Sequence, residues 1–338
     1  MHQTDHQQAI FTRQPWAGWF CLLTLLVLCL IGFSGCGKSA LKSARSDTSC
    51  ERVVSLSPSI TEVLYALDLG PQIAGVTRYC KYPPAAVQKP KVGGYVDPDS
   101  EALLRLRPDL VALREEQTQL VGQLKGLGFR LLTVDHRNTA GILKSLDQVG
   151  LACHRVPQAR ALRQSLERDI EAVRRRLAAT SKRPSVLVVI DRDVHAAKVH
   201  WAFVAGQDGF YDWLIHSAGG KNALPAGKKG FLQISPEGIL RMNPDVIIET
   251  TASIGPGFGT LSQVSQVSQA EKNKAAEAQW ASLSEVSAVK NHRVYHFNQD
   301  YMVIPGPRFP KVLRQFAQAI HPELDWNHEP TRSPVAQP

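Results

Sequence analysis

Short apolar runs alternate from Glu51 onward with segments whose apolar residues recur at helical spacing. Runs rich in Val, Ile and Leu predict strands over residues 52–57, 73–77, 109–113 and 129–135. Ser59 and Glu62 have the spacing of a capping box and predict a helix that ends at Leu69–Gly70. Further helices are predicted to begin near Ser100, Gln117 and Thr139. This alternation predicts a parallel sheet covered on both faces.

One long amphipathic helix is predicted next, over residues 157–181. Its apolar stripe consists of Leu162, Leu166, Ile170, Val173 and Leu177. At ~1.5 Å per residue it would reach roughly 37 Å, about the width of a domain. Alternation then resumes, with strands predicted over 185–191, 202–206, 246–250 and 293–297 and a helix over 209–218. The economical architecture is two α/β lobes with parallel sheets, bridged by one long helix.

The domain boundaries follow from these elements. We expect a first lobe over 52–156, the bridging helix over 157–181, a second lobe over 182–325 and a polar tail over 326–338. The lobes also echo each other, because EALLRLRPDL from Glu101 matches EGILRMNPDV from Glu237. In both, Glu opens a short helix, Pro ends it and a hydrophobic strand follows. Residues 257–279 are polar and repetitive, and we expect a surface loop or marginal helix without site chemistry.

The N-terminus indicates export. Residues 19–33 are apolar and uncharged but too short to span a membrane as a helix, and small residues lead from them to Cys36. The ending FSGC resembles the lipobox of bacterial lipoproteins, although Phe33 replaces the usual Leu. We therefore predict a signal peptide over 1–35, lipidation of Cys36 and a tether over 36–51. A short uncleaved anchor is the alternative, and both place the rest of the chain outside the cytoplasm.

Cysteines and charge narrow the possibilities further. Cys50, Cys80 and Cys153 remain in an oxidising compartment, so we expect one disulfide and one buried thiol, with the pairing left open. No CxxC pair occurs, which argues against a thiolate zinc site. The formal charge of +9 is scattered, and its one tight run, Arg174–Arg176, lies on the long helix. No nucleic-acid-binding module is present, so we expect no nucleic-acid partner.

Motifs for catalysis are weak. GxSxG and HExxH are absent, and a P-loop match at residues 32–39 lies at the signal-peptide exit rather than after a strand. The serines of SLSPS (55–59) have no evident base, and we interpret DRD (191–193) as a solvated turn. We expect neither catalysis, nor a resident metal, nor a cofactor.

Several motifs in order resemble the periplasmic binding proteins for iron chelates and vitamin B12, over nearly the whole chain from Glu51 to about His321. They are RVVSLSPSITEVLYALDLG, GVTRYCKYPP, KVGGYVDPDSEALLRLRPDLV, FVAGQDGFYDWLIHSAGGKNAL, FLQISPEGILRMNPDVII and NHRVYHFNQDYMVIPGPRF. The resemblance implies two α/β lobes joined by a backbone helix, with a ligand cleft between them.

Vitamin B12 binders of this family look most similar. By their pattern, the residues that fall on cleft positions are Tyr79, Tyr95, Phe203, Phe231, Asp300 and Tyr301. Aromatic faces suit the flat surface of a corrinoid, and a few polar groups suit its amide rim. Tryptophans common in B12 binders are replaced here by Tyr95 and Phe231, and Arg114 stands where an aromatic residue is expected.

These departures leave the ligand open. It could be smaller or more anionic than cobalamin, such as a ferric siderophore. Haem binders of the family typically place an Arg two residues after a cleft Tyr, whereas Tyr95 is followed by Val96 and Asp97, which weakens the haem interpretation.

The resemblance also implies partners. Glu101 and Glu237 match the acidic pair, one per lobe, by which such proteins dock to the permease of an ABC importer with its ATPase. We expect a monomer, anchored by lipid. Two other functions stay open: a receptor for bare zinc or manganese, for which the 11 His are dispersed, and a lipoprotein that uses the fold for adhesion or sensing.

Overall fold

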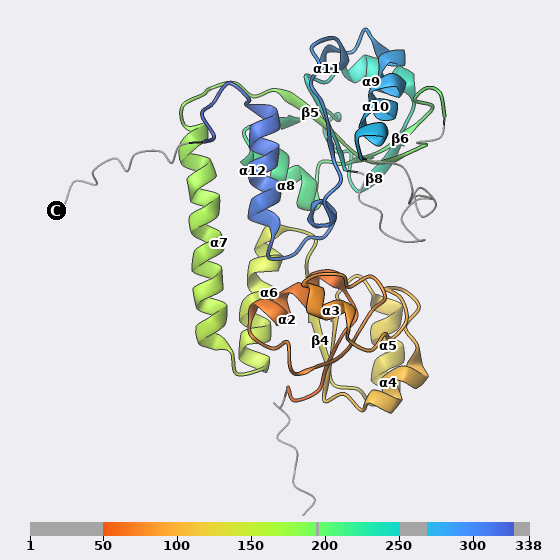
Figure 1. Ribbon diagram of the computed structural model, residues 1–338, viewed down its shortest axis with the longest axis vertical. Coiled ribbons are helices and arrows are strands. Elements are labelled where there is room, and N and C mark those ends of the chain that lie inside the picture. The colour runs from red at the N-terminus through yellow and green to blue at the C-terminus, as the bar shows by residue number, and fades with distance from the viewer. Residues whose placement is uncertain (1–49, 194–195, 251–268, 328–338) are drawn as a thin grey trace, which may run out of the picture. The chain divides into compact units, whose positions relative to one another are not determined.

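The computed structural model describes residues 50–193, 196–250 and 269–327, which all belong to one unit of the chain, Thr48–Pro338 (Figure 1). The predicted signal peptide, the lipidation site Cys36, nearly all of the tether and most of the polar tail lie outside the described residues. In the three described stretches, no helix is both long and apolar enough to cross a membrane.

The first lobe is a four-stranded parallel sheet in the order β2-β1-β3-β4. Its elements are β1 (Val53–Ser55), α2 (Pro58–Ala66), β2 (Ile73–Val76), α3 (Pro84–Val87), α4 (Ser100–Leu106), β3 (Leu110–Arg114), α5 (Thr118–Gly126), β4 (Leu131–Val134) and α6 (Thr139–Ala152). Val53 and Leu110 face the core under α2 and α6, whereas Val54 and Val111 face α4 and α5. Successive side chains of a strand point to opposite faces, so apolar runs here are buried on both sides.

The predicted capping box is wrong. The N-cap of helix α2 lies two residues earlier, at Ser57, with Pro58 in the first turn, and no side chain caps the helix. Proline suits this position because its fixed φ is already helical and its missing N–H would be unpaired there. Ser59 therefore lies inside the helix, and Glu62 is free to bond elsewhere.

The second lobe contains a mixed sheet in the order β10-β9-β5-β6-β8, with β7 paired to β5. Its elements are β5 (Ser185–Arg192), β6 (Ala202–Ala205), α8 (Gly209–Ser217), β7 (Lys221–Asn222), β8 (Phe231–Ile234), α9 (Pro236–Met242), β9 (Val246–Thr250), α10 (Gln269–Trp280), η2 (Ala281–Leu283), α11 (Ser287–Lys290), β10 (Val294–Phe297), η3 (Asp300–Met302) and α12 (Phe309–Ile320). The two-lobed α/β class is confirmed, but the second sheet is not fully parallel: β6 runs antiparallel to both of its neighbours, β5 and β8. Too few residues separate β5 from β6 for the crossover that a parallel pair needs.

Helix α7 (Val156–Leu177) is the predicted long helix. It packs against α6 of the first lobe and α12 of the second, as Figure 1 shows. Leu166, Val173 and Leu177 of its stripe are buried in a core that also contains residues of both sheets. The lobes therefore share one hydrophobic core through α6, α7 and α12, and α12 itself was not predicted.

The sequence repeat is a structural repeat. Helices α4 and α9 have the same length, and each is capped by the preceding polar side chain: Asp99 accepts from the Ala102 N–H and Ser235 from the Gly238 N–H, at 3.0 and 3.3 Å. A capped short helix before a proline is thus used twice.

Both helices of the repeat also end alike, on a left-handed residue: Arg107 at φ 46° and Asn243 at φ 43°. The aspartate after each Pro then accepts from the backbone at the start of the neighbouring strand. Asp109 bonds the Arg52 N–H at 3.0 Å, and Asp245 bonds the Ser185 N–H at 2.8 Å.

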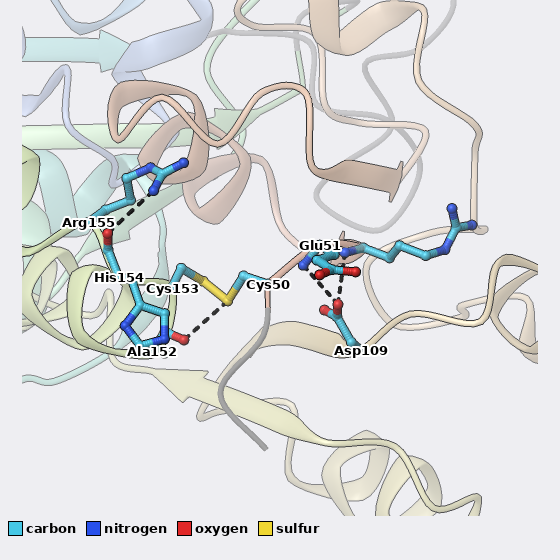
Figure 2. The surroundings of a disulfide bond; sticks show 8 residues. Cys50, Glu51, Asp109, Ala152, Cys153, His154 and Arg155 are labelled. Atoms are coloured by element: carbon cyan, nitrogen blue, oxygen red, sulfur yellow. Dashed lines mark hydrogen bonds between the residues drawn. A yellow bond between two sulfur atoms is a disulfide. The ribbon is translucent and has the colours of Figure 1, made fainter. Parts of the chain in front are cut away.

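One disulfide joins Cys50 to Cys153 (Figure 2). Cys80 is a buried free thiol. This confirms the expected count and supplies the pairing. Cys153 follows the last turn of α6, and the Cys50 sulfur lies 3.3 Å from the Ala152 carbonyl oxygen. The chain therefore enters the first lobe beside the corner between α6 and α7.

Trp326, which the predicted boundaries assign to the tail, is buried and donates to the His321 carbonyl at 2.9 Å.

Candidate ligand-binding site

Two of the predicted tyrosines lie at the carboxyl edge of the first sheet. Tyr79 follows β2, and Tyr95 lies in the loop before α4; both are partly buried. An ion pair of 2.9 Å between Arg78 and Asp97 joins their loops, and the Arg78 guanidinium lies 5.0 Å from the centre of the Tyr79 ring. Ligands of α/β proteins bind at this edge of the sheet.

Tyr95 is held from both ends. Gln117, just after β3, donates to its carbonyl oxygen at 2.6 Å, and its hydroxyl lies 3.5 Å from a Glu116 carboxylate oxygen. The pKa of Tyr95 is raised to about 12, mainly by burial; Arg114 acts to lower it and Glu116 adds to the rise. Arg114 is itself ion-paired with Glu116. The Arg that occupies an expected aromatic position thus has its charge neutralised within the first lobe.

Phe203 and Phe231 lie on neighbouring strands, β6 and β8. Ala205 pairs with Phe231 and Phe203 with Gln233, so the two rings share a sheet face as diagonal neighbours. Phe203 packs edge-on against Trp201 at 5.5 Å. Phe231 is 52% exposed, so much of its ring faces solvent.

A residue that sequence reasoning missed connects Phe231 to the remaining predicted residues. Tyr211 on α8 is buried, and its ring centre lies 6.4 Å from that of Phe231. Its hydroxyl donates to the Met302 carbonyl at 3.0 Å, and burial raises the pKa of Tyr211 to about 12. Met302 ends η3, which carries Asp300 and Tyr301.

Arg308, just before α12, is the centre of a cluster of charged and aromatic side chains. Its Nε and Nη2 donate to both oxygens of Glu62 at 2.9 and 2.5 Å, and its Nη1 and Nη2 donate to both oxygens of Asp300 at 2.9 Å. Its guanidinium carbon lies 3.9 Å from the centre of the Tyr82 ring and 5.2 Å from that of Tyr301. Bidentate pairing and stacking on aromatic faces are the geometry for which a guanidinium is suited.

The Arg308 cluster crosses between the lobes. Glu62 lies on α2 and Tyr82 before α3, whereas Asp300, Tyr301 and Arg308 belong to the second lobe. Neither Glu62, Tyr82 nor Arg308 was predicted. Their signals in the sequence were an acid within an apolar helix, a tyrosine before two prolines, and one Arg in the apolar segment 302–309.

The Glu62–Arg308 ion pair is buried, so both of its charged side chains are largely removed from water. The Glu62 side chain is 3% exposed and that of Arg308 11%. Desolvation raises the pKa of Glu62 to about 7, against the hydrogen bonds and charge of Arg308, which lower it. The pKa of Arg308 is raised by its two carboxylate partners despite its own burial. A buried pair of this kind contributes little net stability, but removing one partner leaves an uncompensated charge.

A family model described as periplasmic binding protein matches residues 53–301. A Bacillus subtilis protein, the uncharacterized ABC transporter substrate-binding lipoprotein YvrC, is 30% identical over 282 residues, which are 81% of each chain. The chain belongs to the periplasmic binding protein family, among the substrate-binding proteins of ABC transporters. The family resemblance seen in the sequence is therefore confirmed.

Relatives with named ligands are more distant. A vitamin B12-binding protein of Yersinia pestis is 27% identical over 222 residues, covering 65% of this chain and 74% of its own. The periplasmic haem-binding protein BhuT, solved with two haems, is 27% identical with a TM-score of 0.65, over 80% of this chain and 98% of its own. The two relatives bind different chelates, so similarity alone leaves the ligand undetermined.

The acidic pair lies at equivalent places in the two lobes of this periplasmic binding protein. Glu101 and Glu237 are exposed residues in the first turns of α4 and α9. A hydrogen bond from Ser235 is the main cause that lowers the pKa of Glu237, so this carboxylate is ionised at neutral pH. Both carboxylates are thus available to a partner, at positions that the repeat relates to one another.

A serine of SLSPS does have a base beside it, contrary to expectation. His136 Nδ1 lies 2.8 Å from the Ser59 hydroxyl, and its Nε2 lies 2.8 Å from the Ser145 hydroxyl. All three side chains are buried, and desolvation lowers the pKa of His136 to about 3. A neutral, enclosed imidazole between two hydroxyls joins α2 to α6, and a substrate cannot reach the serine in this conformation.

The DRD segment is not a solvated turn. Arg192 ends β5 and is buried, and its Nε donates to Glu249 on β9 at 2.8 Å. Trp280, at the end of α10, donates to the same carboxylate at 2.9 Å, and neighbouring Gln279 donates to the Ala196 carbonyl. The polar segment 257–279 therefore ends in a buried network, although residues up to 268 lie outside the described part. In the described stretches, no cluster of three or more His, Cys, Asp or Glu could hold a metal ion.

Proposed function

We propose that this chain captures a bulky metal chelate, cobalamin foremost, between its two lobes and delivers it to the permease of an ABC importer. In this proposal it is a lipid-anchored protein outside the cytoplasm. The observation that supports it most is the Arg308 cluster, where Tyr82 of the first lobe and Tyr301 of the second lie against one guanidinium. A ligand held there would touch both lobes at once.

Cobalamin fits the chemistry of these residues. A corrin ring has two flat faces, which aromatic side chains cover well, and the rings available are Tyr79, Tyr82, Tyr95, Phe203, Phe231 and Tyr301. Its rim carries primary amides, which donate hydrogen bonds. The Asp300 carboxylate is fixed by Arg308 but stays 44% exposed, so it can accept from such a donor.

Haem is the second candidate, because a haem-binding relative matches this chain closely in fold and at 27% identity. Tyrosine binds ferric haem as the phenolate. The raised pKa of Tyr95, at about 12, disfavours the phenolate before a ligand arrives. Nearby Glu116 disfavours it further. This environment supports cobalamin over haem as the ligand of the first lobe.

Delivery would use Glu101 and Glu237. Two exposed carboxylates at equivalent points of two lobes form a symmetric pair, and a dimeric permease offers two equivalent basic surfaces. Charge complementarity there would fix the register of docking and speed encounter.

The test is direct. Purified protein is mixed with cobalamin, haem and a ferric siderophore, and bound colour is separated by gel filtration. Tyr79→Ala and Phe231→Ala should each weaken binding of the retained chelate by roughly 1–3 kcal/mol. Phe129→Ala is the control, because this partly buried ring precedes β4 at the opposite edge of the first sheet. Equal losses in all three variants, or retention of none of the chelates, would contradict the proposal.

A further inference from the structure

The Arg308 guanidinium has no free edge for a ligand. Four hydrogen bonds to Glu62 and Asp300 occupy its Nε and both terminal nitrogens, and two tyrosine rings lie against it. An arginine at a chelate site would ordinarily be assigned to a ligand carboxylate. Here one N–H of Nη1 is outside these four bonds, so a ligand carboxylate could pair with two nitrogens at once only by displacing a protein carboxylate that is already bound at both oxygens.

At pH 8, where Glu62 with a pKa of about 7 is mostly ionised, the formal charges of the cluster add up to −1, from two carboxylates and one guanidinium. Only Asp300 is substantially exposed, at 44%, whereas the side chains of Glu62 and Arg308 are buried. Lys311 is the other cation that acts on Glu62, but it is exposed, so water and salt screen it. The face that the cluster offers to a ligand is therefore a hydrogen-bond acceptor with excess negative charge.

Close packing keeps Glu62 in place. A Cβ at Gly306 would stand 3.1 Å from a Glu62 oxygen and 3.4 Å from the Ser59 Cα, so any larger residue there would require Glu62 to shift by a few tenths of an ångström. Glu62 thus belongs to the first lobe yet neutralises the guanidinium of Arg308 in the second. A long-range contact of this kind, 246 residues apart, is preserved only if the lobes keep their spacing.

We propose that Glu62 and Arg308 determine the ligand specificity of the site, by reserving the guanidinium for protein carboxylates and leaving Asp300 to meet the ligand. The site then selects chelates whose rim carries uncharged hydrogen-bond donors and discriminates against chelates whose rim carries carboxylates. This inference rests on the proposed function and deepens it, since it assigns a ligand class by charge. Glu62 and Arg308 are positioning residues that act through Asp300.

Matched ligand pairs test the charge rule for cobalamin and for haem. Cyanocobalamin is compared with its monocarboxylic acid, in which one amide is hydrolysed, and haem with its dimethyl ester. Equilibrium titration at pH 8 gives the ratio of dissociation constants within each pair. The wild type should bind the uncharged member roughly tenfold more tightly, because a partly exposed like charge is screened but not abolished.

Glu62→Gln removes one negative charge without changing the shape of the side chain. The ratio of dissociation constants for this variant should fall toward one, because the charges of the cluster then cancel. Asp147→Asn is the matched control: it removes the same charge from an exposed carboxylate on α6 that pairs with Arg163 at 2.6 Å, and it should keep the wild-type ratio. Thermal unfolding of each variant checks that it is folded.

A second arm needs no mutation. Burial puts the pKa of Glu62 at about 7, so lowering the pH from 8 to 6 protonates this residue while ligand carboxylates stay ionised. The other charged groups that act on Glu62 are Arg308, Asp300 and Lys311. The wild-type ratio should therefore fall with pH. This arm decides the matter if Glu62→Gln does not fold.

The outcomes separate the two proposals. Binding of either chelate with equal constants within its pair would overturn the charge rule and leave the proposed function standing. A Glu62→Gln ratio equal to that of the wild type would overturn the role of Glu62. A protein that binds none of the four compounds would overturn the charge rule, and one that also retains no ferric siderophore on gel filtration would overturn the proposed function as well.

Discussion

Removal of the Cys50–Cys153 disulfide should destabilise the protein through its unfolded state. The bond spans 103 residues, which include the whole first lobe. Loop-closure entropy for about 100 residues amounts to ~4.7 kcal/mol at 25 °C, and residual structure in the unfolded chain makes this an upper value. We expect the Cys50→Ala/Cys153→Ala variant to lose about 3–5 kcal/mol. At ~2–4 °C per kcal/mol for a chain of this size, the Tm should fall by about 10 °C.

Urea denaturation of the oxidised protein, the reduced protein and the double variant measures this loss, with circular dichroism as the probe. The m-value should rise when the bond is absent, because a chain without the cross-link exposes more surface on unfolding. Cys80→Ala is the control, since it removes a buried thiol and leaves the disulfide in place. Equal midpoints and m-values for oxidised and reduced protein would refute the loop-closure reasoning.

Three further predictions concern buried and exposed charges. The folded pKa of Glu62 is raised from 4.5 to about 7, so its contribution favours the folded state at low pH and is lost as the pH rises through 7. Urea titrations at pH 5 and pH 8 should show that the free energy of unfolding declines by about 3 kcal/mol, and Glu62→Gln should lack this decline. His136 has a lowered pKa, about 3, so stability should be lost as the pH falls from 6.5 toward 3, by up to about 5 kcal/mol, and His136→Asn should lack this acid-sensitive step. Glu101→Lys/Glu237→Lys should bind ligand and melt nearly as the wild type does but fail to support uptake in cells; normal uptake would leave the pair as simple helix-start residues.

Much of the candidate site was accessible from the sequence only as separate motifs. Tyr79, Tyr95, Phe231 and the Asp300 segment were predicted because each lies in a recognisable local pattern. What could not be predicted is the Arg308 cluster, which joins the Asp300 segment to Glu62. Arg308 and Glu62 are 246 residues apart, and the spacing of apolar residues carries no information about which distant charges will pair.

Periodicity by itself determined the two α/β lobes and the long helix, because a helix or strand must bury one face and the apolar residues mark that face. It also determined the repeat of α4 and α9, whose caps and prolines act within a few residues. Only the tertiary structure decided the cysteine pairing, the antiparallel β6 and β8, and the burial of Arg192 with Glu249. Each of these depends on which segments meet in space, and burial then reverses the ordinary preference of a charged side chain for water. The same holds for Glu62, which the sequence offers as a helix-start acid and the fold makes the partner of Arg308.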